Sequence, residues 1–207
     1  MSEPVETPLG PARVASTGDG AAGTLVLGHG AGAGSGSPDL LAVAVEAAGA
    51  GWLVHRVDQP WVVAGKRIAP APARLDEGWG AVLDRLRLTD RLPGRLVLGG
   101  RSAGARVACR TARAEGAAGV LALAFPLHPP GRPEKSRAGE LTGAGVPLVV
   151  VQGETDAFGR PEHVAAALDG LGHASVYAVP GDHALKKNVD LVAAAALSWL
   201  TEVLPGG

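Results

Sequence analysis

The chain has 207 residues, of which 46% are hydrophobic and only 3% aromatic, and its formal net charge is −1. This length suits a single domain over residues 1–207 with a substantial core, which Ala, Val and Leu must largely build. The charge excludes a general attraction to nucleic acid or to an anionic membrane surface.

Cysteine content and the first residues suggest the cellular compartment. The single cysteine, Cys109, cannot form an internal disulfide, and no Cys/His cluster has the spacing of a zinc site. Residues 1–6 are acidic and lack an apolar signal-peptide segment, and no apolar stretch is long enough to span a bilayer. We therefore expect a soluble, cytoplasmic monomer or small homo-oligomer, without a metal or an organic cofactor.

The first half of the chain predicts strands and helices in alternation. Residues 5–7 and 12–14 could pair as a hairpin. An apolar run at 24–27 ends in glycine, which is typical of a strand buried on both faces. After a glycine-rich loop, Ser37-Pro38 begins a helix. The remaining elements expected in this half are a helix over 38–49, a strand over 52–57, a loop over 58–72 and an amphipathic helix over 74–88.

The second half continues the same alternation. The expected elements are strands over 96–98, 120–125, 146–151 and 175–179, a helix after Ser102, a proline-rich loop over 126–131, and helices over 161–171 and 188–203. Such alternation predicts an α/β protein with a mostly parallel sheet, helices on both faces and right-handed crossovers. Ligand sites in these sheets collect at the carboxyl ends of the strands.

One turn in this pattern carries a candidate nucleophile. The strand at 96–98 stops at two glycines, and a helix-favouring segment begins directly after Ser102. Between them, Gly100-x-Ser102-x-Gly104 matches the nucleophile elbow, a strained turn that lifts a serine hydroxyl above the sheet edge. Larger residues two positions from the serine would collide with a neighbouring strand or helix. The alternative is an ordinary turn serine, because a chain with 31 glycines can contain the motif by chance.

A serine hydroxyl needs a base, and the base needs an orienting acid. Asp156 and His183 each follow a later predicted strand, so the chain order is Ser102, Asp156, His183, which is the order of the α/β-hydrolase fold. Ser102 would attack a carbonyl, His183 would carry the proton and Asp156 would hold the imidazole. Asp182 competes for the acid role, and Asp156 could instead cap the following helix.

Histidines other than His183 have simpler explanations. His55 lies within a predicted strand, whereas His163 and His173 flank a predicted surface helix. His29 would support the glycine-rich loop or touch substrate. His128, in the proline-rich loop, either lines the pocket or braces its own turn.

Two backbone N–H groups are candidates for stabilising an oxyanion. Ala103 begins the helix after the elbow, so the positive end of that helix strengthens its N–H as a donor. Ala31 lies in the glycine-bounded loop after an earlier strand, where such folds place the second donor.

Several cations are expected at the same edge of the sheet. Arg101 precedes the serine, and together with His29 and His128 it is a candidate substrate-binding residue. An anionic substrate, such as a carboxylate-bearing ester or an acyl-CoA, would suit these charges, whereas a solvated rim is the alternative. The other cations of this set are Lys66, Arg67, Arg132, Lys135 and Arg137.

Five short motifs occur in order through nearly the whole chain. They lie at residues 27–32, 99–104, 125–131, 152–159 and 181–183. This set resembles the small dienelactone-hydrolase-like α/β-hydrolases, most closely the branch with a testis-expressed hydrolase-like protein and the hydrolase-like domain of an NSL-complex subunit. The resemblance implies the triad Ser102, Asp156 and His183 but no particular substrate. Dienelactone hydrolases themselves use a cysteine nucleophile, and some members of the branch serve as scaffolds.

These observations favour an α/β-hydrolase, without a large cap domain, that cleaves a small-molecule ester or thioester through an acyl-serine intermediate. A peptidase on the same fold is one alternative, but it would need an extra domain or a long lid, and no insertion here is long enough. A non-catalytic interaction module is the other alternative.

Overall fold

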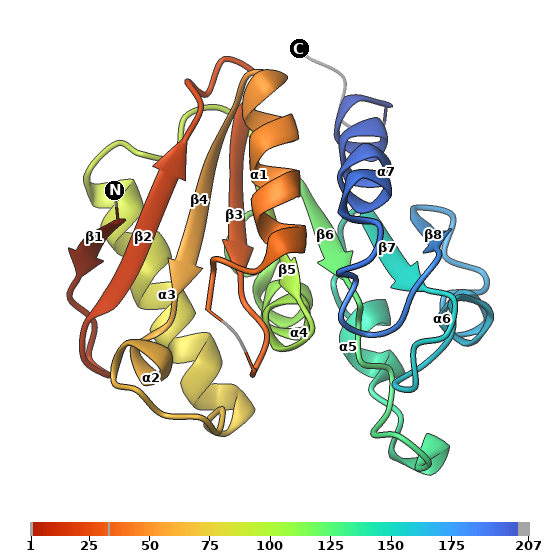
Figure 1. Ribbon diagram of the computed structural model, residues 1–207. Coiled ribbons are helices and arrows are strands. Elements are labelled where there is room, and N and C mark those ends of the chain that lie inside the picture. Colours follow the sequence, from red (N-terminus) through yellow and green to blue (C-terminus); the bar gives the residue numbers. More distant parts are fainter. Residues whose placement is uncertain (1, 33, 203–207) are drawn as a thin grey trace.

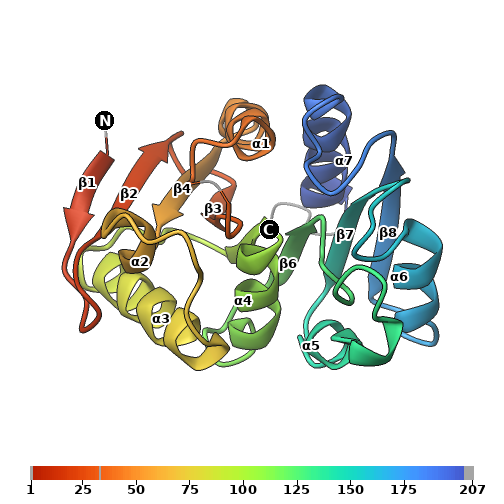
Figure 2. The ribbon, with the colours of Figure 1, turned by 60° about the horizontal axis from the view of Figure 1, so that its bottom comes forward.

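A computed structural model describes residues 2–32 and 34–202. Its centre is an eight-stranded sheet in the order β1-β2-β4-β3-β5-β6-β7-β8. Figures 1 and 2 show α1 and α7 on one face of the sheet and α3, α4, α5 and α6 on the other. The strands are β1 (Ser2–Val5), β2 (Ala12–Thr17), β3 (Gly23–Gly28), β4 (Trp52–Asp58), β5 (Leu96–Arg101), β6 (Gly119–Leu123), β7 (Leu148–Gly153) and β8 (Ala174–Val179). The helices are α1 (Pro38–Gly49), α2 (Pro60–Val63), α3 (Pro72–Leu88), α4 (Ala103–Thr111), η1 (Pro133–Lys135), α5 (Ala138–Thr142), α6 (Pro161–Ala167) and α7 (Val189–Glu202).

The sheet is mostly parallel and buried on both faces, as the sequence predicts. Strands β4, β3, β5, β6, β7 and β8 pair in parallel, whereas β2 pairs antiparallel with both of its neighbours, β1 and β4. Along β3, Leu25 and Leu27 pack into the core beneath α1 and α7, whereas Val26 packs into the core on the other face. A strand that must bury both sides therefore needs the continuous apolar run seen in the sequence.

Strand β3 marks the point where the chain changes direction across the sheet. It pairs with β4 on one side and β5 on the other. The connection from β3 to β4 runs through α1 on one face, whereas β5 is entered from α3 on the opposite face (Figure 1). The loops that follow β3 and β5 therefore leave the sheet toward opposite faces, at the carboxyl edge where α/β sheets bind ligands.

The structure corrects the sequence prediction at several boundaries. The hairpin pairs Ser2–Val5 with residues 12–15 rather than 5–7 with 12–14, because Thr7 bonds with Leu9 and Gly10 and makes the intervening segment a turn. Two short helices, α2 and α5, occupy segments expected to be loops or left unassigned, and α6 ends at Ala167 rather than at 171. Position 203, predicted to end the last helix, lies outside the described residues.

The described residues contain neither a cap domain nor a membrane-spanning helix. No segment in them forms a cap domain over the carboxyl edge of the sheet. None of the helices they contain is long and apolar enough to cross a membrane.

Candidate active site

The turn between β5 and α4 holds Ser102 in a strained conformation. Its φ is 52° and its ψ −106°, which is a costly region for a residue with a Cβ. The Ser102 N–H donates to the carbonyl of Leu123 on the neighbouring strand at 2.9 Å. The sheet therefore holds the turn that exposes the hydroxyl.

Glycines let the elbow pack against β3. A Cβ at Gly100, where φ is 152°, would overlap the carbonyl oxygen of Gly28, and so would a Cβ at Gly104. Backbone atoms of β3, β5 and α4 therefore approach too closely for any side chain. This contact explains both glycines of the elbow motif in the way that the sequence suggests.

Ser102, His183 and Asp156 lie in one hydrogen-bonded chain at the carboxyl edge. The Ser102 hydroxyl lies 2.9 Å from Nε2 of His183, and Nδ1 of His183 lies 2.7 Å from Oδ2 of Asp156. In the neutral imidazole, Nδ1–H donates to the carboxylate and Nε2 accepts the hydroxyl proton. The three side chains come from the ends of β5 and β7 and from the loop after β8.

Two neighbours that sequence reasoning missed hold the Asp156 carboxylate and the imidazole in place. Gln152, wholly buried at the end of β7, donates its amide to Oδ2 of Asp156 at 2.9 Å. The backbone N–H of Phe158 donates to Oδ1 at 2.8 Å, and the Phe158 ring packs on the His183 imidazole with 4.2 Å between centroids. A glutamine within an otherwise apolar strand was the only sequence signal for this arrangement.

The sequence left two alternatives open: Asp182 as the partner of His183, and Asp156 as a helix cap. The structure supports neither. Asp182 accepts a hydrogen bond from the backbone N–H of Ala184 at 3.0 Å. Arg160, not Asp156, occupies the N-cap position of α6. Asp156 is therefore the carboxylate that contacts His183.

The loop after β3 lies against the serine. A Cβ on Gly30 would be 3.5 Å from Cβ of Ser102, so the segment that leads into Ala31 passes close to the elbow. Ala103 is the first residue of α4, where N–H groups have no acceptor inside the helix. An oxyanion hole formed by the N–H groups of Ala31 and Ala103 stays a prediction.

Comparison with known proteins gives the family. A family model described as an alpha/beta hydrolase domain matches residues 21–197. The chain belongs to this α/β hydrolase family. Among curated proteins, none matches the chain significantly.

Solved α/β hydrolases share the fold over nearly their whole length. A serine hydrolase without a lid from Xanthomonas campestris is 20% identical, with a TM-score of 0.81 over 100% of this chain and 96% of that one. A serine hydrolase homologue from Coxiella burnetii is 17% identical, with a TM-score of 0.80 over 96% of each chain. A thermophilic esterase from Thermogutta terrifontis, solved with malate bound, is 19% identical, with a TM-score of 0.70 over 99% of each.

His29 and His128 contact backbone in this α/β hydrolase. The buried His29 accepts from the N–H of Gln59 at 3.1 Å through Nε2, and its Nδ1 lies 2.9 Å from the Gly30 carbonyl. Nδ1 of His128 lies 3.0 Å from the carbonyl oxygen of Pro129, and the backbone N–H of His128 donates to the carbonyl oxygen of Phe158. These contacts support the glycine-rich loop and the proline-rich turn, and contact of either side chain with substrate stays a prediction.

The cations expected at the edge of the hydrolase fall into separate groups. The guanidinium of Arg101 contacts Asp39 and the carbonyl of His183, and Arg137 donates to the carbonyl of Pro126. Lys66 and Arg67 instead line a groove of about 410 Å³ that Ala31 also lines.

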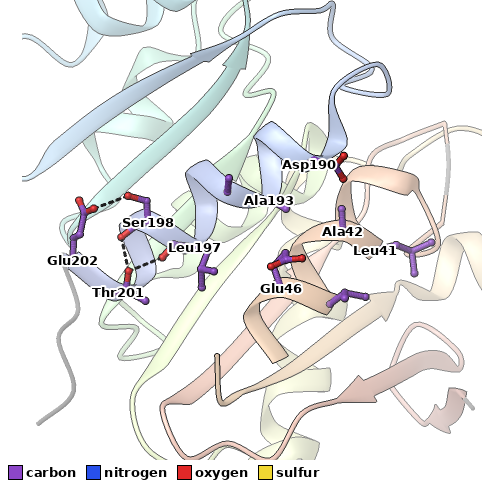
Figure 3. Close-up of a pocket in the computed structure, with 11 residues that line it drawn as sticks. Leu41, Ala42, Glu46, Asp190, Ala193, Leu197, Ser198, Thr201 and Glu202 are labelled. Atoms are coloured by element: carbon purple, nitrogen blue, oxygen red, sulfur yellow. Dashed lines mark hydrogen bonds between the residues drawn. The ribbon is translucent and has the colours of Figure 1, made fainter. Parts of the chain in front are cut away.

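A second groove lies away from the carboxyl edge of this hydrolase. It has a volume of about 820 Å³ and runs between α1 and α7 (Figure 3). Three of its polar side chains bond within α7, where Ser198 donates to Glu202 and Thr201 to backbone carbonyls. None of its lining residues is among the candidate site residues.

Two further titratable side chains of the hydrolase, those of His55 and Cys109, are buried in the fold. His55 bonds to Ser16 and to the Arg91 carbonyl, and burial lowers its pKa. Burial, followed by the charge of Glu140, raises the pKa of Cys109 to about 12, so this thiol is no nucleophile at neutral pH. Within the described residues, no group of three or more His, Cys, Asp or Glu side chains could hold a metal ion.

Proposed function

We propose that this α/β hydrolase cleaves a small ester or thioester through an acyl-serine intermediate, with Ser102, His183 and Asp156 as its catalytic triad. The observation that carries the proposal is the unbroken chain from hydroxyl to imidazole to carboxylate, with separations of 2.9 and 2.7 Å. A base in this position raises the nucleophilicity of a serine that would otherwise be inert near pH 7.

Each atom of the site has a role in the proposed reaction. Oγ of Ser102 attacks the carbonyl carbon while its proton passes to Nε2 of His183. The N–H groups of Ala31 and Ala103 donate to the oxygen that becomes negative. When the tetrahedral intermediate collapses, the alcohol or thiol leaves and takes the proton from Nε2 of His183. Water then attacks the acyl group in the same way, releasing the carboxylate product and the free hydroxyl.

Asp156 acts on the imidazole and not on the substrate. Its carboxylate selects the tautomer with the proton on Nδ1 and stabilises the imidazolium that forms. Gln152 and the N–H of Phe158 hold the carboxylate from two sides, so the oxygen that faces Nδ1 cannot rotate away without breaking hydrogen bonds.

The groove beside Ala31 is the proposed site for part of the substrate. Gly32, Gly34 and Gly65 form much of its wall, and Lys66 and Arg67 stand at it. Neither cation forms an ion pair within the described residues. We therefore propose that an ester with a carboxylate or phosphate group is preferred over its neutral analogue.

The family assignment can also be narrowed as a proposal. The five motifs shared with the dienelactone-hydrolase-like group, in the same order, support a place in the branch with the testis-expressed hydrolase-like protein and the NSL-complex subunit. That placement favours an ester or thioester as substrate over a peptide, in a cytoplasmic enzyme.

A panel of p-nitrophenyl esters of rising acyl length, together with acyl thioesters, tests the proposed activity. Wild type should release product with a rapid first turnover that matches the enzyme concentration, whereas Ser102→Ala should not. A folded wild type that hydrolyses no member of the panel would favour the non-catalytic module. Cleavage of peptides without cleavage of esters would favour the peptidase.

A further inference from the structure

We infer that Arg101 is a positioning residue that holds the backbone of the general base, and that the buried carboxylate of Asp39 holds Arg101 in turn. This inference rests on the proposed function, because it concerns the same serine and histidine. It replaces the expectation that Arg101 binds an anionic substrate.

The guanidinium lies between two anchors. Its Nη2–H donates to the carbonyl oxygen of His183 at 2.8 Å, and its Nε lies 3.2 Å from Oδ2 of Asp39. The Arg101 side chain is 13% exposed and that of Asp39 is fully buried. Most of the guanidinium is thus enclosed by protein and is not open to a substrate.

A buried carboxylate needs a countercharge, and here Arg101 supplies it. Among residues 2–32 and 34–202, Arg101 is the only cation within ion-pair distance of Asp39. Asp39 also lies in the first turn of α1, where the positive helix end favours a negative charge. Removing the cation would leave the carboxylate buried and unpaired, so the pair fixes the position of the guanidinium.

His183 is the triad member that most needs such an anchor. It lies between β8 and α7, in a segment outside regular helix or strand. Asp156 fixes its ring at Nδ1, whereas Arg101 fixes its backbone. Because Arg101 directly precedes Ser102, the end of β5 controls both the nucleophile and the backbone of the base.

The same guanidinium also lies against the loop that carries Ala31. A Cβ added to Gly30 would be only 2.7 Å from Nη1 of Arg101. The planar group of Arg101 therefore contacts the base and the proposed oxyanion loop while it is joined to the nucleophile. A lysine ammonium is a point charge that cannot reach several partners in this geometry.

Replacing Arg101 by lysine tests the inference. Arg101→Lys keeps a countercharge for Asp39 but loses the fork, so kcat should fall about 10- to 100-fold, whereas KM should stay unchanged for both neutral and carboxylate-bearing esters. Arg110→Lys is the matched control, because the Arg110 side chain is similarly buried, at 17% exposure, and bonds to Asp76 and Glu140 away from the site. This control should keep the wild-type kcat.

A second variant covers the case in which Arg101→Lys does not fold. Asp39→Leu combined with Arg101→Met removes both charges, so no unpaired charge stays buried. The His183 carbonyl still loses its donor, and kcat should therefore fall as in Arg101→Lys at constant KM. In Arg101→Ala, methylguanidinium should restore part of the lost kcat, and an equal concentration of sodium chloride should not.

The outcomes separate this inference from the proposed function. A wild-type kcat in Arg101→Lys would overturn the inference, and so would a rise in KM confined to charged esters, while the esterase activity itself would stand. A wild type without activity would overturn the proposed function first.

Discussion

Two groups of arginine contacts occur at helix α4, and their geometry differs. The outer network is formed by Arg106 and Arg110, which lie in the helix, and the inner pair is Arg101 with Asp39. In the outer network, Arg106 and Arg110 both donate to Glu140, and Arg110 also donates to Asp76. These five hydrogen bonds of 2.6 to 3.1 Å join α3, α4 and α5. Arg101, just before the helix, makes one aligned hydrogen bond to a carbonyl. Its contact with Asp39 is an ion pair without hydrogen-bond alignment.

The difference separates stability from activity along one helix. The outer network satisfies its charges bidentately, which is the strongest geometry for such pairs. The inner pair leaves the oxygens of Asp39 without hydrogen bonds, a cost for buried polar groups, and it places the guanidinium against the base. The outer network thus stabilises the fold, whereas we propose that the inner pair, Arg101 with Asp39, serves the site.

The largest expected effect follows from the strained serine. Ser102→Gly removes the nucleophile, so kcat should fall on the order of 10⁶-fold. Glycine also tolerates the φ of 52° found at this position, so the free energy of unfolding should rise by about 1 kcal/mol. Ester hydrolysis and chemical denaturation measure the two effects.

Ser102→Ala is the control for this separation. It should be equally inactive but should not gain stability, because alanine keeps the Cβ that makes the turn costly. If Ser102→Gly proved less stable than Ser102→Ala, the strain at the elbow would not be stored as we describe.

The second effect concerns the outer network. Glu140→Gln leaves Arg106 and Arg110 with a weaker acceptor, so the free energy of unfolding should fall by about 1–3 kcal/mol. The kcat of the folded enzyme should stay close to that of wild type. Urea denaturation and steady-state kinetics on one preparation give both values, and a large fall in kcat would show that the network also shapes the site.

The same network should make the free energy of unfolding depend on pH through the Glu140 carboxylate. Burial alone would raise the pKa of Glu140, but hydrogen bonds and charges from Arg106 and Arg110 outweigh it, and the pKa is lowered from 4.5. A carboxylate with a lowered pKa in the folded state stabilises above its unfolded pKa and loses this contribution as pH falls through its folded pKa. Wild type should therefore lose its stability advantage over Glu140→Gln below about pH 4.5, as denaturation at several pH values can check.

The smallest effect is expected at the open groove. Lys66 and Arg67 are exposed, so water screens their charges. Lys66→Gln with Arg67→Gln should raise KM for a carboxylate-bearing ester about two- to tenfold at low salt and leave KM for the neutral analogue unchanged. An equal change in both KM values would remove the anionic preference.

Sequence patterns predicted the alternating sheet because each long element has its own period or apolar run. They also indicated Ser102, Asp156 and His183, which follow strand ends in a recognisable order. The short helix α2 has four residues, too few for a periodic pattern, and was therefore missed.

The contacts around Ser102, Asp156 and His183 could not be predicted from sequence patterns. Gln152 reaches Asp156 four residues along the chain, but Asp39 and Arg101 are 62 positions apart in the sequence and only the fold brings them together. An arginine beside a nucleophile looks like an anion site in sequence, and only the buried carboxylate opposite it indicates another role.

Labelling with a fluorophosphonate probe, followed by peptide mass spectrometry, tests the central claim most directly. The account predicts one adduct, on Ser102, with labelling lost in Ser102→Ala and strongly slowed in His183→Ala. A folded wild type that stays unlabelled, or an adduct on another residue, would contradict it.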